Sequence, residues 1–334
     1  MNEAVLALEV EDLHVLHRRG DQQVALVDGI SFAIRQGEIF GLVGESGSGK
    51  SISALATVRL LGSDISTRGS VKLDGRELLE LSEVEMRKVR GGRISMIFQE
   101  PTTALNPVFT VGTQIVAAIR AHLPMTRIDA RKRAEQLLRQ VGIPDPASRL
   151  NYYPHQLSGG MCQRVMIAMA LAAGARFVIA DEPTTALDVT IQAEIVKLLE
   201  HLVRENGLSL LFISHDLGLV ARVCDRVAVA YAGQIVESGE TEALLRSPMH
   251  PYMQGLVKCV ADFEEVGTVR GGIPGNPPLP GSWLQGCRFQ PRCTFAADGC
   301  EKPQSLREIR PGHVVRCWRA GSIVLQPVTA GATA

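Results

Sequence analysis

The chain has 334 residues, more than a single hydrophobic core usually serves, so we expect two or more structural units. Lysine plus arginine number 35, as do aspartate plus glutamate, so no overall electric field favours nucleic acid or an acidic membrane surface as a partner. The seven cysteines are an odd number, which weighs against a fully paired disulfide scaffold.

The N-terminal stretch MNEAVLALEVEDLHVLHRRG does not look like a secretory signal, because it carries acidic residues where a basic region belongs. The longest apolar run, VMIAMALAA at residues 165–173, is about half of the roughly 20 residues that a membrane-spanning helix needs. We therefore expect a chain that stays inside the cell and does not cross a membrane. In that compartment, clustered cysteines favour metal or redox chemistry over disulfides.

Short apolar runs alternate with helical patterns between about residues 25 and 240, which predicts an α/β fold with a mostly parallel sheet. The runs are EIFGLVG (38–44), RISMIFQ (93–99), RFVIADE (176–182) and LLFISHD (210–216). The basic stretch at 127–140 has the pattern of an amphipathic helix. Periodicity fails after about residue 245, and the Gly/Pro-rich stretch at 271–283 indicates an irregular connection. We predict a nucleotide-binding domain over residues 1–245 and a small, irregular C-terminal extension over 246–334.

The stretch GLVGESGSGKS contains the phosphate-loop pattern G-x-x-x-x-G-K-[ST], with a predicted strand before it and a helical pattern after it. In such a loop the backbone N–H groups surround the phosphates, Lys50 reaches the β and γ phosphates, and the Ser51 hydroxyl ligates Mg²⁺. The predicted ATP-contacting residues are Gly44, Glu45, Ser46, Gly47, Ser48, Gly49, Lys50 and Ser51.

Two carboxylates, Asp181 and Glu182, follow the apolar run FVIA, at the strand end where ligands bind in open α/β sheets. We expect Asp181 to bind Mg²⁺, directly or through water. We expect Glu182 to orient or deprotonate the attacking water, because phosphoryl transfer depends on positioning and charge neutralisation. The alternative is an ordinary helix N-cap.

The stretch PHQLSGGMCQRVMIAMALA at 154–172 resembles the signature region of the ATPase subunits of ATP-binding cassette (ABC) transporters. Met161 stands where glutamine is usual, whereas Ser158, Gly159 and Gly160 match the family. The resemblance implies that these three residues cap ATP held by the phosphate loop of a second cassette. It also implies a P-loop NTPase fold with a RecA-like core and a helical subdomain at about residues 100–160.

Other family elements follow in the expected order. Gln99 resembles the Q-loop glutamine, a further Mg²⁺ ligand, TALD at 185–188 resembles the D-loop with Asp188, and His215 resembles the switch histidine. The resemblance implies catalytic roles for Gln99, Glu182 and His215. His17 takes the place of the aromatic residue that stacks on adenine; an exposed loop histidine is the alternative.

Longer matches, such as IFQEPTTALNPVFTVGTQI and HPYMQGL, resemble the dipeptide/oligopeptide importer ATPases. This resemblance implies an ATP-hydrolysing subunit on the cytoplasmic face of the cell membrane. Its implied partners are a second, homologous cassette ATPase, two membrane permease subunits and, indirectly, an extracytoplasmic substrate-binding protein. No nucleic-acid partner is expected.

The same resemblance extends to four cysteines near the C-terminus, spaced C-x5-C-x6-C-x16-C. They are Cys287, Cys293, Cys300 and Cys317. The spacing lacks the C-x2-C pairs of common zinc ribbons and fits four thiolates on a wrapping loop, as iron–sulfur clusters use. We expect a [4Fe–4S] cluster, with structural zinc or unligated thiols as the alternatives.

The sequence does not identify the cargo, and related subunits also serve nickel or glutathione uptake. A soluble cassette ATPase acting on DNA or ribosomes is a further alternative, although the chain has one phosphate loop and no heptad array. A non-catalytic scaffold is a third, against which stand Lys50, Asp181, Glu182 and His215.

Overall fold

The computed structural model describes residues 5–185, 187–266 and 272–323. The chain divides by compactness into two units. Unit 1 comprises residues 1–7, 34–39 and 80–213, and unit 2 comprises residues 8–33, 40–79 and 214–334. The predicted domains, 1–245 and 246–334, partition the chain differently, and that division stays a prediction.

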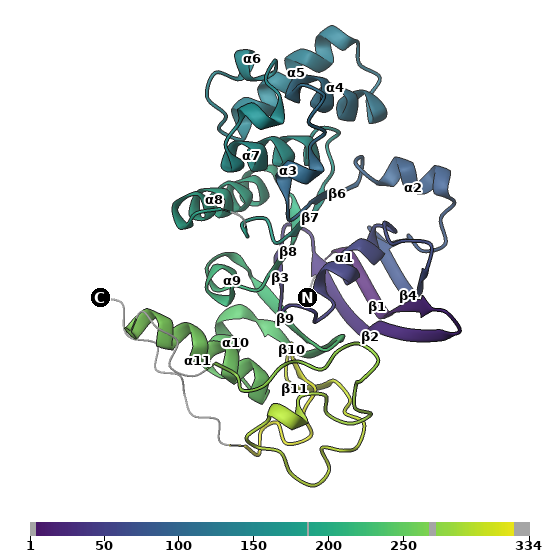
Figure 1. Ribbon diagram of the computed structural model, residues 1–334, viewed down its shortest axis with the longest axis vertical. Coiled ribbons are helices and arrows are strands. Elements are labelled where there is room, and N and C mark those ends of the chain that lie inside the picture. The colour runs from purple at the N-terminus through teal and green to yellow at the C-terminus, as the bar shows by residue number, and fades with distance from the viewer. Residues whose placement is uncertain (1–4, 186, 267–271, 324–334) are drawn as a thin grey trace. The chain divides into compact units, whose positions relative to one another are not determined.

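Most of a four-stranded sheet with the order β2-β1-β4-β5 belongs to unit 2 (Figure 1). Its strands are β1 (Leu6–Arg19), β2 (Gln22–Arg35), β4 (Ile65–Leu73) and β5 (Arg76–Glu77). β1 runs antiparallel to β4, and their register shifts between Glu11 and His14. Such a shift interrupts the alternation of buried and exposed residues along a strand.

Five further strands of unit 2 belong to an eight-stranded sheet, in which they follow the order β11-β12-β10-β9-β3. They are β3 (Ile39–Val43), β9 (Arg226–Tyr231), β10 (Gln234–Glu240), β11 (Arg307–Arg310) and β12 (His313–Val315). β3 pairs in parallel with β9 and is buried at all five positions, as expected of a parallel strand covered on both faces. The helices of this unit are α1 (Lys50–Thr57), α9 (Leu217–Val223), α10 (Thr241–Arg246), α11 (Pro251–Val266) and the 3₁₀ turn η2 (Gln290–Arg292).

The C-terminal extension is more regular than its sequence predicts. The predicted lack of periodicity after residue 245 was wrong for α11, which is a helix of 16 residues. In addition, β12 pairs with β10 and adds a strand beside it. The completely buried Glu237 of β10 accepts hydrogen bonds from the backbone N–H groups of Met249 and His250, and lies 2.7 Å from His313 Nε2 of β12. One carboxylate thus connects β10, the start of α11 and the extension.

Unit 1 contains three parallel strands in the order β8-β7-β6, which confirms the predicted parallel sheet. They are β6 (Ile94–Ile97), β7 (Phe177–Asp181) and β8 (Ser209–Ser214). The helices are α2 (Glu83–Val89), α3 (Pro101–Ala104), α4 (Val111–His122), α5 (Arg127–Gln140), α6 (Pro146–Arg149), η1 (Pro154–Gln156), α7 (Gly159–Ala170) and α8 (Val189–Asn206).

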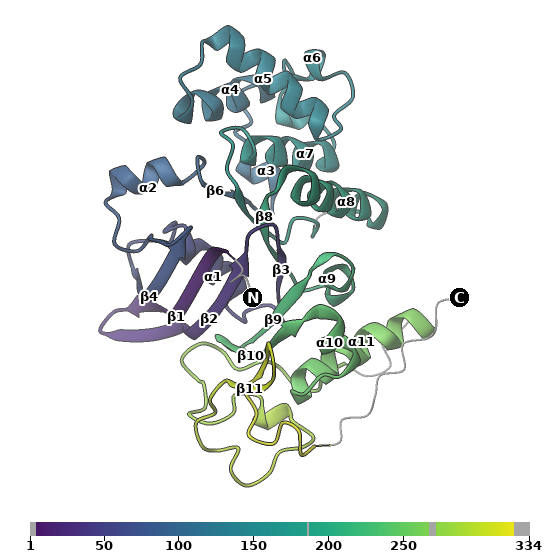
Figure 2. The ribbon, with the colours of Figure 1, turned by 180° about the vertical axis from the view of Figure 1, so that it is seen from behind.

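The helices α4 and α5 lie side by side and contact α7 in both views (Figures 1 and 2). α5 has the predicted bounds of 127–140 and buries Ala130, Ala134, Leu137 and Leu138, which confirms an amphipathic helix. Thr110 and Thr126 cap α4 and α5 by accepting hydrogen bonds from backbone N–H groups of the first turn. These caps fix where each helix of the subdomain begins.

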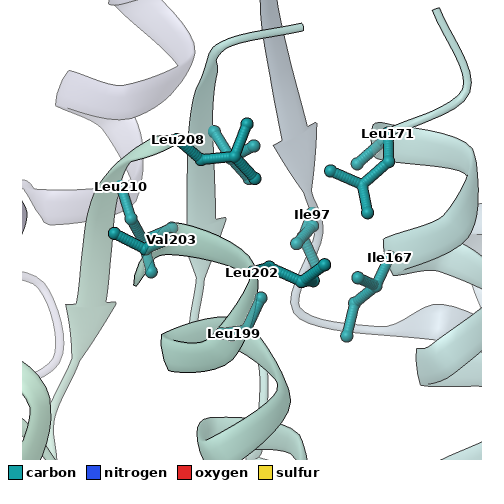
Figure 3. A pocket seen from close by; sticks show the side chains of 10 residues that line it. Ile97, Ile167, Leu171, Leu199, Leu202, Val203, Leu208 and Leu210 are labelled. Atoms are coloured by element: carbon teal, nitrogen blue, oxygen red, sulfur yellow. The ribbon is translucent and has the colours of Figure 1, made fainter. Parts of the chain in front are cut away.

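The core of unit 1 lies between its sheet and the helices α7 and α8 (Figure 3). Leu199 and Leu202 of α8 point toward Ile97 of β6 and Ile167 of α7, around a small cavity. Ten aliphatic residues line this cavity, so it offers a ligand no polar partner. We treat it as a packing defect of the core.

Replacement of Leu202 by alanine is expected to destabilise the protein by about 2–5 kcal/mol, because the side chain is 2% exposed and its removal enlarges the cavity. Urea unfolding of the full chain, followed by far-UV circular dichroism, measures the effect. The matched control on the same helix is Val189→Ala, at a position 81% exposed, with an expected change within about 0.5 kcal/mol. Equal effects of the two substitutions would contradict this assignment of the core.

Candidate functional site

The predicted phosphate loop connects β3 to α1 and depends on two glycines. Gly44 has φ 151°, and a Cβ atom there would lie 2.1 Å from the carbonyl oxygen of Ala230 in β9. Gly49 precedes α1 with φ 97°, in the left-handed region that other residues rarely adopt. The backbone thus turns sharply next to β9 and enters α1, as a phosphate-binding loop requires.

Lys50 is the first residue of α1 and is 4% exposed. Its Nζ donates hydrogen bonds to the carbonyl oxygens of Gly44, at 2.8 Å, and Glu45, at 3.1 Å. These contacts place the ammonium group within the curve of the loop. Ser51, the predicted Mg²⁺ ligand, follows in the first turn of the helix and is partly exposed.

The Glu45 side chain pairs with Arg292, a residue that sequence reasoning missed. Its carboxylate accepts two hydrogen bonds from Arg292, at 2.7 and 3.0 Å, and its backbone N–H donates to the hydroxyl of Tyr252 at 2.9 Å. Burial acts to lower the pKa of Arg292, but its hydrogen bonds to Glu45 and Tyr231 and the charge of Glu45 raise the pKa above the ordinary value. Burial also raises the pKa of Tyr252, which keeps its hydroxyl neutral.

Asp181 and Glu182 stand at the carboxyl end of β7 in unit 1. Asp181 is buried as the last residue of the strand, and Glu182 follows with φ 45°. A left-handed glutamate is a strained backbone position of the kind found at functional sites. The backbone N–H of Glu182 donates to the carbonyl oxygen of Ile213, the residue opposite Asp181 in β8, which fixes this position.

The structure brings Gln99 and Glu182 together. Gln99 Nε2 donates to Glu182 Oε2 at 3.2 Å, and the hydroxyl of Thr185 donates to the same oxygen at 2.8 Å. Sequence reasoning missed Thr185, although it lies in the predicted D-loop stretch 185–188. Ala186 of that stretch lies outside the described residues. Two donors therefore orient the carboxylate that we predict to act on water.

The signature residues occupy the N-terminus of α7. Ser158 is the N-cap and accepts a hydrogen bond from the Met161 N–H, so the departure at Met161 leaves the cap intact. Ser158 and Gly159 are exposed, whereas a Cβ on Gly160 would lie 2.7 Å from Ile191 of α8. The helix N-terminus thus presents backbone N–H groups to the surface, where a phosphate would be favoured.

Three further predicted residues lie within a strand or next to the end of a strand or helix. Asp188 is exposed and caps α8 through a hydrogen bond from the Ile191 N–H. His215 is exposed and follows β8 directly. His17 lies in β1, not in a loop, with its Nε2 2.8 Å from Asp64 Oδ2. Its stacking on adenine stays a prediction, as do the roles of the other two.

The predicted site residues divide between the two units. Unit 1 contains Gln99, the signature residues, the two carboxylates and Asp188, whereas unit 2 contains His17, the phosphate loop and His215. Within unit 1, Gly160 contacts the first turns of the helix that Asp188 caps.

The four C-terminal cysteines all lie in unit 2 and are free thiols. The pKa of Cys287 is raised to about 11, chiefly by burial, and charge on the other three thiols contributes to the rise. Burial likewise raises the pKa of Cys293 and of Cys317, and charge on the Cys300 thiol adds to each rise.

The cysteine site has polar support but is not arranged around a single ion. The Cys287 N–H donates to the Cys300 carbonyl oxygen at 2.7 Å, and the indole N–H of Trp318 donates to the Cys300 sulfur at 3.4 Å. Over the described part of the chain, no three cysteine, histidine or acidic side chains are grouped so as to bind a metal ion. The donor set is nonetheless soft, partly buried and unpaired by disulfides, as a thiolate-ligated cluster requires.

Two sequence families match this chain. The family described as "ABC transporter" matches residues 27–185, and the family "Oligopeptide/dipeptide transporter, C-terminal region" matches residues 236–300. Together they cover the phosphate loop, the signature, the two carboxylates and three of the four clustered cysteines.

Curated relatives match over nearly the whole chain. A probable peptide ABC transporter ATP-binding protein of Sinorhizobium fredii is 49% identical over 96% of this chain and 97% of its own length. The dipeptide transport ATP-binding protein DppD of Escherichia coli is 46% identical over 93% of this chain and 95% of its own. The oligopeptide transport ATP-binding protein OppD of Salmonella typhimurium is 44% identical over 95% of this chain and 94% of its own.

Solved structures support the same fold. The ATP-binding cassette MJ0796, in a dimeric post-hydrolysis state bound to ADP and Pi, matches with a TM-score of 0.63 and 26% identity, over 70% of this chain and 98% of that one. The cbiO1 subunit of the cbiONQ transporter from Clostridium perfringens matches with a TM-score of 0.61 and 27% identity, over 74% of this chain and 97% of that one. The chain thus belongs to the ABC transporter ATPases, in the branch of the peptide-transport ATP-binding proteins.

Proposed function

We propose that this chain binds and hydrolyses ATP to energise the import of dipeptides or oligopeptides. The observation that carries the proposal is 49% identity to a peptide-transport relative across 96% of the chain. Lys50 at the start of α1 in unit 2, and Asp181 and Glu182 at the end of β7 in unit 1, are the side chains that would carry the chemistry. Nickel or glutathione as cargo is the alternative, since the motor does not contact the cargo.

Phosphate binding is assigned to unit 2 and water activation to unit 1. The loop from Gly44 to Ser51 would bind the phosphates through its N–H groups and Lys50, with Gly44 and Gly49 setting its turn. Glu182, oriented by Gln99 and Thr185, would take a proton from the attacking water. His215 would complete the catalytic set.

Magnesium is the metal that this donor set fits. A hydroxyl, an amide oxygen and a carboxylate, from Ser51, Gln99 and Asp181, are the hard oxygen ligands that Mg²⁺ prefers alongside phosphate. When bound, the ion neutralises charge on the phosphate oxygens.

A second cassette is proposed to complete the site. The exposed N-terminus of α7 with Ser158 and Gly159 suits a γ-phosphate on a partner cassette, and Asp188 lies exposed at the start of α8. We propose a heterodimer with a homologous ATPase, bound to two permease subunits and served by an extracytoplasmic substrate-binding protein. No nucleic acid takes part.

The proposed location is the cytoplasmic face of the cell membrane. Among the described helices, none combines the length and apolar character needed to traverse a bilayer. Attachment would therefore be peripheral, through the permease subunits.

The four cysteines are proposed to bind a [4Fe–4S] cluster, with zinc as the alternative. A tetrahedral zinc draws four sulfurs around one ion at Zn–S distances of about 2.3 Å, and the described residues form no group of that kind. A cluster spreads its thiolates around several atoms, so the four cysteines need not converge on one ion. Once bound, it would tie together an extension with little apolar core.

Glu182→Gln should lower the rate of ATP hydrolysis by about 100-fold or more while MgATP binding is retained, because the amide keeps the shape of the carboxylate without its basicity. Phosphate release by the complex assembled with its partners is the measurement. Glu205→Gln, on the exposed face of α8, is the control and should turn over normally. A Glu182→Gln complex that hydrolyses ATP at the wild-type rate would refute the assignment of the base.

Protein purified without oxygen is expected to absorb broadly near ~400 nm and to contain about four irons per chain. Cys293→Ser should remove the iron, whereas Cys259→Ser, in α11, should retain it. Iron and zinc analysis of the three proteins is the measurement. Stoichiometric zinc without iron in the wild-type protein would rule out the cluster.

Cells that lack this chain should lose uptake of labelled dipeptides or longer peptides. Wild-type protein should restore uptake, and Lys50→Ala should not, because the phosphates lose their cation. Uptake of labelled dipeptide, hexapeptide, glutathione and Ni²⁺ is measured in parallel. If peptide uptake stays intact and uptake of glutathione or Ni²⁺ is lost, that compound is the cargo and the proposal of peptide import is wrong.

A further inference from the structure

The C-terminal extension contacts the phosphate loop through a buried ion pair. Arg292, one residue before the predicted cluster ligand Cys293, donates through both terminal nitrogens to the two carboxylate oxygens of Glu45. The Arg292 side chain is 6% exposed and that of Glu45 is 25% exposed. A bidentate pair of this kind fixes both direction and distance, unlike a flexible surface salt bridge.

Arg292 is itself positioned by the extension. Its Nε donates to the carbonyl oxygen of Pro274 at 2.8 Å, and a terminal nitrogen donates to that of Ile273 at 3.2 Å. The residue ends η2, which lies between Cys287 and Cys293. The guanidinium therefore reaches Glu45 only when this part of the extension is folded.

An aromatic cluster gives the loop a second contact. Tyr231 of β9, Tyr252 of α11 and Phe289 of the extension pack against one another with ring centroids 4.6 to 5.4 Å apart. Tyr252 is completely buried, and its hydroxyl accepts the hydrogen bond from the Glu45 N–H. Phe289 thus helps to hold the Tyr252 ring, whose hydroxyl orients the Glu45 N–H at the start of the loop.

The far end of the loop is supported in the same way. The N–H of Gly233, in the turn between β9 and β10, donates to the carbonyl oxygen of Ser48 at 3.0 Å. The indole of Trp283 covers Gly233 so closely that a Cβ there would lie 2.3 Å from the ring. Arg288 stacks on Trp283 and pairs with Asp28, whose N–H donates to the Gly233 carbonyl oxygen.

We propose that the extension is a positioning element for the phosphate loop, and that Arg292 is the positioning residue that links its folding to ATP affinity. The inference rests on the proposed ATP-binding function of that loop. A loop whose N–H groups are already aligned binds phosphates without a further ordering cost. Removing Arg292 would leave the partly buried Glu45 carboxylate unpaired beside the phosphate site, where its charge opposes that of the ligand. By linkage, bound ATP stabilises the extension in return.

The test is the equilibrium dissociation constant of the full chain for a fluorescent ATP analogue with Mg²⁺, measured beside its thermal unfolding. Arg292→Gln should weaken binding of the analogue about tenfold. Arg292→Lys keeps the positive charge but not the two parallel N–H donors, so its affinity should lie between those of Arg292→Gln and the wild type. Arg319→Gln is the matched control, because Arg319 donates to the carbonyl oxygen of Phe295 within the extension. It should bind as the wild type does.

Glu45→Gln keeps the test decisive if Arg292→Gln does not fold, because it lies outside the extension. Glu45→Gln should also alter the affinity for the ATP analogue. The double variant that combines Glu45→Gln with Arg292→Gln should bind the analogue no more weakly than Arg292→Gln alone, as expected of residues that act through one contact. Wild-type affinity in Arg292→Gln, additive effects in the double variant, or an equal loss in Arg319→Gln would overturn the proposal. If Lys50→Ala instead binds the ATP analogue with wild-type affinity, the proposed ATP site itself is wrong.

Discussion

The chemistry proposed for this chain depends on one constraint, the turn of the backbone between β3 and α1. Several N–H groups must face one point there, which only a tightly turned backbone permits. Gly44 allows the loop to approach the Ala230 carbonyl oxygen, and Gly49 admits the left-handed entry into α1. The surroundings must therefore determine the shape of the loop. In unit 2 these are β9, the turn at Gly233 and the Arg292 contact with Glu45.

Unit 1 meets a different requirement, the precise orientation of a single carboxylate. Glu182 occupies a strained backbone position at the end of a fully buried strand, and its Oε2 accepts hydrogen bonds from Gln99 and Thr185. The signature helix α7 begins at an exposed Ser158 cap with its N–H groups turned outward. In the proposed mechanism, phosphate binding, water activation and completion of the site are separate tasks. Hydrolysis then requires both units and a partner cassette, which suits a motor that acts only when assembled.

Local sequence patterns predicted much of the fold. The buried runs around Phe40 and Ile179 became parallel strands, the stretch at 127–140 became α5, and Ser158 became a helix cap, because each depends on neighbours within a few residues. Contacts between distant residues had no such signal. Arg292 and Glu45 are 247 positions apart, and Tyr252 and Glu45 are 207 apart. The α11 helix was missed because Pro251 and Gly255 lie in its first turns, and these residue types are typical of turns and loops.

Hydrogen exchange on the full chain, with and without saturating MgATP, tests the central claim most directly, because it reports on individual backbone N–H groups without requiring the partner subunits. The account predicts slower exchange in residues 44–51 and, through the Arg292 contact, in residues 287–293, while helix α5 of unit 1 exchanges as before. Unchanged exchange in residues 44–51 at saturating MgATP would contradict the assignment of this loop as the nucleotide site.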